Sequence, residues 1–296
     1  MSQILVIGAG FMGTGIAQVC AQAGYYVNLM DTNASALEKS IEAMHDSLKK
    51  LQQKGFIEEH PRTVLERISL VEDLSTASLV DWVIEAVPEV EDLKKEIFHE
   101  LDKSAADNTI LATNTSTIPI TRIAEVTKKQ ERVIGLHFFG PVPLMGIVEV
   151  VKGQNTSDDV FSRSVSFVES LKKRPIRVMK DIPGFVMNRI FAAAFKEALE
   201  LVDKGISTPE DIDAGMKLGY GWRAGPFEIA DNAGLDTYLL VGLTMKTLGE
   251  EHLVPDSDLI ERMVNKGRLG RKVSKGFYTY DPEGKRLPWD RGRDLP

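Results

Sequence analysis

The 296-residue sequence is poor in cysteine, in long apolar runs and in net positive charge. Its single cysteine, Cys20, excludes an intramolecular disulfide framework and a cysteine-rich metal centre. No apolar run reaches the roughly 18 residues that a membrane-spanning helix needs. The opening residues also lack the basic stretch and small-residue cleavage site of a secretory signal. We therefore expect a cytoplasmic protein that does not insert into membranes.

The charge balance is acidic. The chain has 36 Lys and Arg against 43 Asp and Glu, a formal net charge of −7. General nucleic-acid binding relies on a basic face, so we expect no nucleic-acid partner. We also find no cluster of residues with metal-ligand spacing and no supported serine or cysteine nucleophile. The chemistry must therefore be sought in other motifs.

Strand-like runs alternate with helix-like stretches over the first 180 residues. Several of these runs are almost continuously apolar, as in a parallel sheet covered by helices on both faces. The pattern predicts an α/β fold of the doubly wound, Rossmann-like type. The predicted strands are Gln3–Ile7, Tyr26–Met30, Asp81–Ala86, Thr109–Thr113, Arg132–His137, Ile147–Val151 and Ile176–Met179.

A change of class follows residue 182, where Pro183 and Gly184 mark a natural boundary. We predict an α/β domain over residues 1–182, with a helical insertion at about 33–67. Residues 183–296 are predicted to form an all-helical domain. Its polar, Pro-rich C-terminal tail is expected to be poorly ordered. The predicted helices of this domain are Phe185–Lys204, Pro209–Leu218, Pro226–Thr247 and Ser257–Lys266.

The clearest motif is ILVIGAGFMGTGIAQ, which places Gly8, Gly10 and Gly13 between a strand and a helix. These glycines allow a tight turn, close approach of the backbone to a pyrophosphate, and close helix–strand packing. The helix N-terminus then offers its N–H groups to phosphates. Asp31 follows the second strand, 18 residues after Gly13, where a carboxylate accepts bonds from ribose hydroxyls and repels a 2′-phosphate. The motif favours NAD over NADP, although a glycine-rich turn without ligand is the alternative.

A histidine and a glutamate are the leading candidates for chemistry. His137 ends a predicted strand, and a histidine there can take a proton from an alcohol. Taken alone, it is more simply a residue that satisfies backbone groups at a strand end. Glu149 lies within an apolar strand, where it faces either solvent or a buried surface shared with Ile147 and Val151. A buried carboxylate needs a partner, and an imidazolium would be suitable.

Polar residues near the predicted strand ends complete the candidates. Asn114 and Ser116 follow the strand that ends at Thr113. Asn188 shares a helical stripe with apolar residues, so its amide meets either the backbone or a ligand carbonyl. Lysines 49, 50 and 54 lie in the helical insertion and, by themselves, indicate only a solvated face.

Spaced motifs across residues 2 to 281 give the chain a resemblance to the 3-hydroxyacyl-CoA dehydrogenases, particularly the 3-hydroxybutyryl-CoA type. The motifs are GAGFMGTGIA, EAVPEVEDLK, NTSTIPIT, GLHFFGPVP, PGFVMNRI, AGPFEIADNAGLD and LGRKVSKGFYTY. The resemblance implies reversible, NAD-dependent oxidation of an L-3-hydroxyacyl-CoA by a homodimer. It implies that residues 1–182 form the NAD-binding domain and that residues 183–296 form the substrate and dimerisation domain. It also implies site residues. His137 matches the catalytic base and Glu149 its carboxylate partner, while Ser116 and Asn188 match residues that hold the reacting oxygens.

The same resemblance implies contacts to the cofactor and to coenzyme A. Ser47 and Lys54 match positions in the helical insertion that contact coenzyme A, whose phosphates an ammonium group can meet. Ser116 also matches a cofactor contact. The remaining cofactor positions are Gly8, Gly10, Phe11, Met12, Gly13, Asp31, Glu89, Lys94 and Lys272.

Two departures from the family pattern stand out. Gly140 replaces the Asn that follows the histidine by three residues and normally approaches the cofactor. Trp222 and Arg223 precede Gly225-Pro226 where the family often has a Pro-Met-type sequence. Both are compatible with an unusual acyl group. A dehydrogenase of a free hydroxy acid and a non-catalytic protein that reuses the fold remain the alternatives.

Overall fold

A computed structural model describes residues 2–290 and 295. The chain divides into two units, Met1–Ile182 and Pro183–Pro296, which are described separately below. No helix in the described part of the chain is long and apolar enough to span a bilayer.

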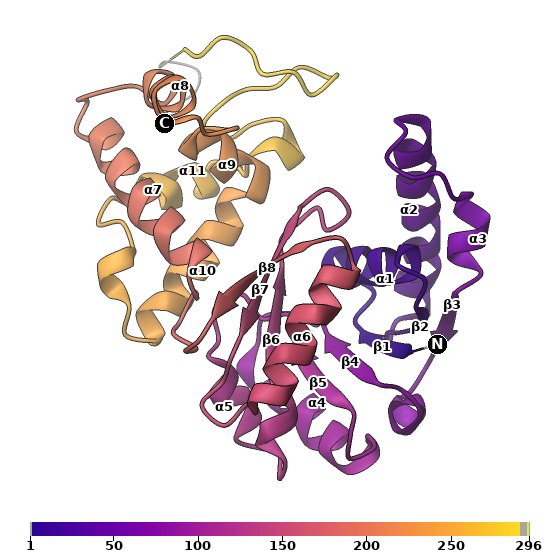
Figure 1. The fold of residues 1–296 in the computed structure, drawn as a ribbon. Helices are drawn as coiled ribbons and strands as arrows, with labels where there is room; N and C mark the ends of the chain where they lie inside the picture. Colours follow the sequence, from indigo (N-terminus) through magenta and orange to yellow (C-terminus); the bar gives the residue numbers. More distant parts are fainter. Residues whose placement is uncertain (1, 291–294, 296) are drawn as a thin grey trace. The chain divides into compact units, whose positions relative to one another are not determined.

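The first unit is built on one eight-stranded sheet with the order β3-β2-β1-β4-β5-β6-β7-β8 (Figure 1). Neighbouring strands run parallel except for the antiparallel pair β6–β7. The order reverses between β1 and β4, and ligands of doubly wound sheets bind beyond the strand ends at such a reversal. The strands are β1 (Gln3–Ile7), β2 (Tyr26–Met30), β3 (Ile68–Val71), β4 (Trp82–Glu85), β5 (Ile110–Thr113), β6 (Val133–Phe138), β7 (Ile147–Val151) and β8 (Arg174–Val178).

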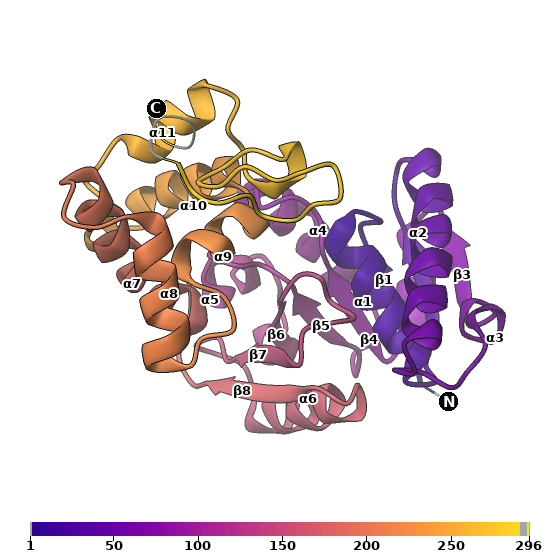
Figure 2. The same cartoon turned by 90° about the horizontal axis from the view of Figure 1, so that it is seen from above.

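Helices cover both faces of this sheet, and Figure 2 shows α6 on one side and α5 on the other. Side chains of α1 and α6 share one apolar core with the sheet, including Ile16, Phe161 and Phe167. The α-helices described in this unit are α1 (Phe11–Gln22), α2 (Ala34–Gln53), α3 (Pro61–Leu65), α4 (Glu91–Ser104), α5 (Ile120–Ala124) and α6 (Asp158–Ser170). The predicted doubly wound α/β fold is confirmed, with β1, β4, β5, β6 and β7 buried along nearly their whole length.

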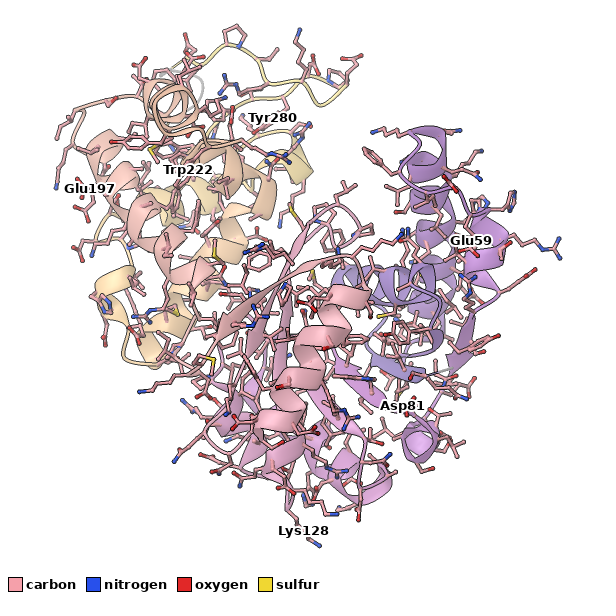
Figure 3. The ribbon with its side chains drawn as sticks, viewed as in Figure 1. Glu59, Asp81, Lys128, Glu197, Trp222 and Tyr280 are labelled. Atoms are coloured by element: carbon pink, nitrogen blue, oxygen red, sulfur yellow. The ribbon has the colours of Figure 1, made fainter. Side chains whose placement is uncertain are left out.

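The insertion between β2 and β4 contains more than the two helices that the sequence predicts. Asn33 caps α2 by accepting a hydrogen bond from the Ser35 N–H, and α3 follows after a short turn. Arg67 pairs with Glu59, which is labelled in Figure 3, and closes this segment. The chain then forms β3, an edge strand that the sequence analysis missed. It is only four residues long, its sequence is interrupted by Ser69, and all four residues are partly or fully exposed.

The second unit is helical. Its helices are α7 (Met187–Asp203), α8 (Pro209–Tyr220), α9 (Pro226–Ala233), α10 (Leu235–Thr247) and α11 (Leu259–Asn265). The single helix predicted over Pro226–Thr247 is wrong, because Gly234 breaks it into α9 and α10. Gly234 has φ +98°, a conformation outside the helical region that glycine adopts without strain.

The segment after α11 completes the core of the second unit. Phe277 and Tyr278 are fully buried against Phe195 and Phe227. Tyr278 donates its hydroxyl to Asp213 (2.7 Å), and its N–H donates to Asp231 (2.9 Å). Arg286 then pairs with Glu228 and stacks over Tyr278. The start of the tail is therefore held by specific contacts, contrary to our expectation, while residues 291–294 and 296 lie outside the described residues.

Candidate active site

The glycine-rich turn connects β1 to α1 with almost no room for side chains. A Cβ on Gly13 would lie 1.8 Å from the Gly8 carbonyl oxygen, and one on Gly8 would lie 2.8 Å from the Ala86 oxygen. Gly8 also has φ +102°. By contrast, a Cβ on Gly10 would meet nothing within 4 Å, so the space in front of the helix is open. Gly10 is the N-cap of α1 and provides no side-chain cap, which leaves the first N–H groups of the helix directed at that space.

Asp31 has a second function that the sequence analysis did not predict. It lies directly after β2, and its Oδ2 accepts a hydrogen bond from the Ala9 N–H at 2.7 Å. Its Oδ1 accepts from the Asn33 N–H at 2.8 Å. The carboxylate therefore supports the glycine turn. Open space, a helix N-terminus and a carboxylate together fit a dinucleotide of the NAD type.

His137 and Glu149 face each other across the antiparallel pair β6–β7. They are directly paired in register, and His137 Nδ1 lies 2.7 Å from Glu149 Oε2. The side chains are 5% and 0% exposed. The structure thus brings together the two residues that the sequence singled out, and Glu149 is buried rather than turned to solvent. A carboxylate bound to Nδ1 holds the proton there, so the basic nitrogen of the neutral ring is Nε2.

Two further side chains hold the chain around His137. Asn114 Oδ1 accepts a hydrogen bond from the Phe138 N–H at 2.8 Å, which ties β5 to the residue after the histidine. Lys173, buried, donates to the carbonyls of Val142 and Met145 at 2.7 and 2.6 Å and so fixes the following loop. Burial lowers the pKa of Lys173. No sequence pattern points to Lys173, because its partners are backbone carbonyls far away in the chain.

Gly140 lies in that loop, close to the first turn of α1. A Cβ on Gly140 would be 2.7 Å from Phe11 Cε1 and 3.4 Å from Met12 Sδ. Phe11 is 71% exposed. The absence of a side chain at position 140 therefore leaves room for the Phe11 ring beside the glycine turn.

A buried charge network lies between the glycine turn and the loop that carries Ser116. Glu89 Oε1 accepts hydrogen bonds from the N–H groups of Ser116 and Thr117 at 2.8 and 2.9 Å, and from the Thr115 hydroxyl at 2.6 Å. Burial raises the pKa of Glu89, but the Lys94 ammonium and these hydrogen bonds outweigh it and hold the pKa below its ordinary value. Glu89 is therefore an ionised anchor for the Ser116 loop.

Lys94 meets a carboxylate that the sequence analysis missed. Its ammonium lies 2.7 Å from Glu85 Oε1 and 3.5 Å from Glu89 Oε2. Glu85 ends β4 and is completely buried. The signal that drew attention to Glu149, a carboxylate inside an apolar strand, was also present at Glu85.

The remaining predicted residues lie on α2 of the first unit and in the second unit. Ser47 is half-buried on α2 and Lys54 is the exposed C-cap of the same helix. In the second unit, Asn188 is half-buried in the first turn of α7. Lys272 pairs with Asp236 at 2.6 Å. Trp222 (Figure 3) follows α8 and is half-buried, while Arg223 is exposed.

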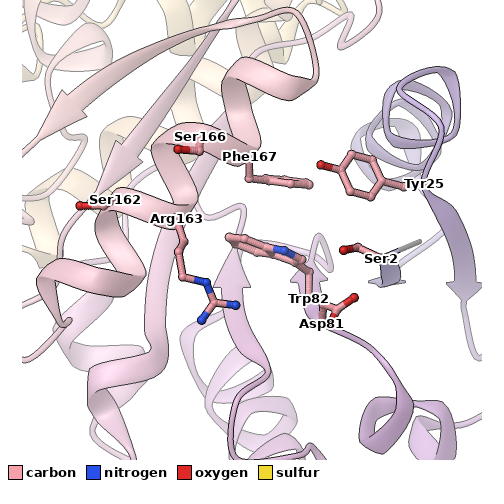
Figure 4. A pocket seen from close by; sticks show the side chains of 8 residues that line it. All are labelled: Ser2, Tyr25, Asp81, Trp82, Ser162, Arg163, Ser166 and Phe167. Carbon is pink, nitrogen blue, oxygen red and sulfur yellow. The ribbon is translucent and has the colours of Figure 1, made fainter.

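A separate pocket lies at the amino ends of the strands, where β1 and β4 begin (Figure 4). The rings of Trp82 and Phe167 stack there at 4.5 Å, and Tyr25 meets Phe167 edge-on. Parallel strands place their carboxyl ends away from this pocket, so it is not part of the candidate active site.

Comparison with known proteins points to one family. The family model described as "3-hydroxyacyl-CoA dehydrogenase, NAD binding domain" matches residues 3–182, and the corresponding C-terminal domain model matches residues 184–280. The chain is 42% identical over 289 residues to the mitochondrial hydroxyacyl-coenzyme A dehydrogenase of Rattus norvegicus, covering 95% of this chain and 91% of that protein. It is 41% identical over 283 residues to a probable 3-hydroxybutyryl-CoA dehydrogenase of Bacillus subtilis, covering 95% and 98%.

A solved structure agrees with these sequence matches. The (S)-3-hydroxybutyryl-CoA dehydrogenase of Ralstonia eutropha superposes with a TM-score of 0.87 at 39% identity, covering 95% of this chain and 99% of that one. The similarity therefore extends through both units.

Proposed function

The chain belongs to the 3-hydroxyacyl-CoA dehydrogenase family, and from that membership we propose how its own residues carry out the NAD-dependent oxidation of an L-3-hydroxyacyl-CoA to the 3-oxoacyl-CoA. The observation that carries the proposal is the buried His137–Glu149 pair at the end of β6. It lies in the same unit as a glycine turn suited to NAD.

His137 acts as the general base in this proposal. With Nδ1 bound to Glu149, Nε2 accepts the proton of the substrate's 3-hydroxyl group. The Glu149 carboxylate, 2.7 Å away and shielded from water, stabilises the imidazolium that forms. NAD, when bound, would accept the hydride that leaves C3 of the substrate as the 3-oxo group forms. In the reverse direction, the imidazolium returns its proton to the oxygen of the 3-oxo group.

Ser116 and Asn188 bind the reacting oxygens. Glu89 holds the backbone N–H of Ser116, and this fixes the loop from which the serine hydroxyl is presented. Asn188 contributes an amide from the first turn of α7 in the helical unit. Two donors on the oxygen would stabilise negative charge as the hydroxyl loses its proton.

The residues that would hold NAD include the whole glycine turn. The N–H groups of α1 would meet the pyrophosphate, and Asp31 would meet the ribose. Lys272 would contribute from the helical unit. The complete proposed set is Gly8, Gly10, Phe11, Met12, Gly13, Asp31, Glu89, Lys94, Ser116 and Lys272.

Coenzyme A is proposed to lie along α2. Ser47 and Lys54 are seven residues apart, which is close to two helical turns, so both lie on one side of the helix. Lys54 is exposed at the helix end, where its ammonium can meet a phosphate of coenzyme A.

The test is the oxidation of NADH by acetoacetyl-CoA, followed by loss of NADH absorbance, with free acetoacetate as the comparison substrate. We expect turnover with the thioester and little with the free acid. Comparable turnover of both would favour the hydroxy-acid alternative, and no turnover of either, with NADH bound, would favour a non-catalytic protein.

The His137→Gln variant then tests the proposed base. General-base help is worth about 10²–10⁴ in rate, so we expect turnover to fall at least a hundredfold while NADH binding is retained. Near-normal turnover in that variant would show that another group takes the proton.

We propose that the protein is a cytoplasmic homodimer assembled through its helical unit. Helices α7, α8 and α10 all expose large apolar side chains, among them Ile190, Leu218 and Leu243. On α10 only Leu235 and Met245 are buried within the chain. Such surfaces favour association. Light scattering should give two chains per particle, and a mass of one chain at micromolar concentration would reject the dimer.

A further inference from the structure

Glu85 is a fully buried carboxylate that the mechanism above does not use. It is the last residue of β4, between the ends of β1 and β5 in the sheet. Its two oxygens accept three hydrogen bonds. Oε1 binds the Lys94 ammonium at 2.7 Å and the Val87 N–H at 2.8 Å, and Oε2 binds the Thr113 hydroxyl at 2.7 Å. Glu85 is therefore fixed from three sides at the reversal point of the sheet.

Lys94, on α4, is as deeply buried as Glu85. Its ammonium has three oxygen neighbours, which are Glu85 at 2.7 Å, the Val87 carbonyl at 3.2 Å and Glu89 at 3.5 Å. An ammonium group has three N–H donors, and three protein oxygens stand around this one. Lys94 thus joins the end of β4 to the segment that follows it.

One side of this network touches the glycine turn. Glu85 binds the N–H of Val87, and Lys94 binds its carbonyl, so both polar groups of that residue are held. The same segment lies directly against Gly8, where an added Cβ would be 2.8 Å from the Ala86 oxygen and 3.3 Å from the Val87 nitrogen. Any shift of Ala86 or Val87 is therefore transmitted to the turn that would bind the pyrophosphate.

The other side of the network reaches Ser116. Lys94 lies 3.5 Å from Glu89, and Glu89 accepts the N–H groups of Ser116 and Thr117. Thr113, which donates to Glu85, also accepts a hydrogen bond from the Thr115 N–H at 3.2 Å. Two routes of direct contact therefore run from Glu85 to the loop on which Ser116 lies.

We propose that Glu85, acting through Lys94 and Thr113, is a positioning residue that sets the place of Ser116 relative to the glycine turn. In this proposal Glu85 contacts neither NAD nor the acyl-CoA substrate. The proposal rests on the function proposed above, since Ser116 matters only if it binds the reacting oxygen. A displacement of about 1 Å in such a group can reduce the rate on the order of a hundredfold. Loss of the Glu85 charge should therefore reduce turnover even in a folded protein.

A merely stabilising role is the competing explanation, because breaking any buried ion pair is destabilising. The same unit supplies a matched control. Asp102 and Arg132 form an ion pair at 3.1 Å with side chains 6% and 5% exposed. Arg132 directly precedes β6, so this pair lies at the amino ends of the strands, away from Ser116. Asp102→Asn removes one charge from a comparable buried pair without touching the proposed site.

The experiment compares Glu85→Gln with Asp102→Asn. Each variant is melted by circular dichroism, and kcat with acetoacetyl-CoA and the Kd for NADH are measured at least 15 °C below its own Tm. We expect both variants to lose thermal stability. Glu85→Gln should lower kcat by about 10- to 100-fold, a larger factor than its effect on the Kd for NADH, whereas Asp102→Asn should stay within about twofold of wild type in both.

Milder variants of Thr113 guard against a Glu85 variant that does not fold. Thr113→Val keeps the side-chain shape but removes the hydroxyl that binds Glu85, and Thr113→Ser retains it. We expect a loss of several-fold in kcat for the valine variant and near-normal kcat for the serine variant. Equal kcat values in both Thr113 variants, or a kcat of Glu85→Gln no lower than that of Asp102→Asn, would overturn the proposal.

Failure of the proposed function would give a different result. In that case His137→Gln would retain turnover, or the wild-type protein would have none with acetoacetyl-CoA. If His137→Gln is inactive and Glu85→Gln is fully active, only the positioning role is wrong.

Discussion

Gly140→Asn is expected to tighten NADH binding only when Phe11 is shortened as well. The added Cβ would lie 2.7 Å from Phe11 Cε1, whereas ordinary contacts begin at 3.4 Å, so the ring must retreat by about 0.7 Å. The Phe11 ring is largely exposed and can turn, at a cost of about 1 kcal/mol for an unfavourable rotamer. A single hydrogen bond from the new amide to the cofactor would contribute about 1 kcal/mol. The cost of turning the Phe11 ring and the gain from the new hydrogen bond therefore nearly cancel.

The assay is a double-mutant cycle of NADH fluorescence titrations on wild type, Gly140→Asn, Phe11→Ala and the double variant. We expect Gly140→Asn to lie within about twofold of wild type. The double variant should bind NADH about fivefold more tightly than Phe11→Ala, which is the factor that about 1 kcal/mol gives. Melting temperatures should differ by only a few degrees, because no buried group is disturbed.

Two results would refute this reasoning. A fivefold tightening in Gly140→Asn alone would show that the Phe11 ring does not obstruct the amide. Unchanged NADH affinity in every variant, with a raised KM for acetoacetyl-CoA, would place the side chain at position 140 against the acyl group instead of the cofactor.

Two other predictions concern carboxylates of the first unit. Glu149→Gln should lower kcat by a larger factor than it weakens NADH binding, since the carboxylate stabilises the imidazolium; a change confined to NADH affinity would indicate a structural glutamate. Asp31→Ala should narrow the preference for NAD over NADP in steady-state assays and also weaken NADH binding, because the turn loses the bond at Ala9. Asp31→Asn is its control, since the amide oxygen can keep that bond. An unchanged ratio of the two cofactors in both Asp31 variants would mean that another group recognises the ribose.

Much of the fold could be predicted because the central strands are buried on both faces and therefore form apolar runs. β3 could not be found in this way. It lies at the sheet edge, and its residues, from Ile68 to Val71, remain partly exposed. The break at Gly234 was visible as a glycine two residues after Asn232, but a helix tolerates some glycines. Only the local conformation, with φ +98°, decides that this one ends a helix.

The part of the site that could be predicted is the His137–Glu149 pair, because a carboxylate in an apolar strand needs a cationic partner. Glu149 in an apolar strand required a cation, and the register of β6 and β7 supplies His137. The network around Glu85 joins residues from β4, α4 and β5, and its geometry depends on how these elements pack in space. The same applies to Phe11 and Gly140, whose contact no spacing in the sequence indicates.

The order in which the ribosome makes the chain matters for the helical unit. Asp213 and Asp231 emerge 65 and 47 residues before Tyr278, the residue to which both are bonded. At about 5–20 residues per second, Asp213 waits about 3–13 s for that partner. Before then Asp213 can already accept the N–H groups at the start of α9. Asp231, in contrast, accepts hydrogen bonds from residues 277, 278 and 280, so its carboxylate remains in contact with water until they emerge. The nascent helical unit therefore depends on completing the stretch that ends at Tyr280, and a chain stalled before Phe277 exposes an unfinished core to chaperones and proteases.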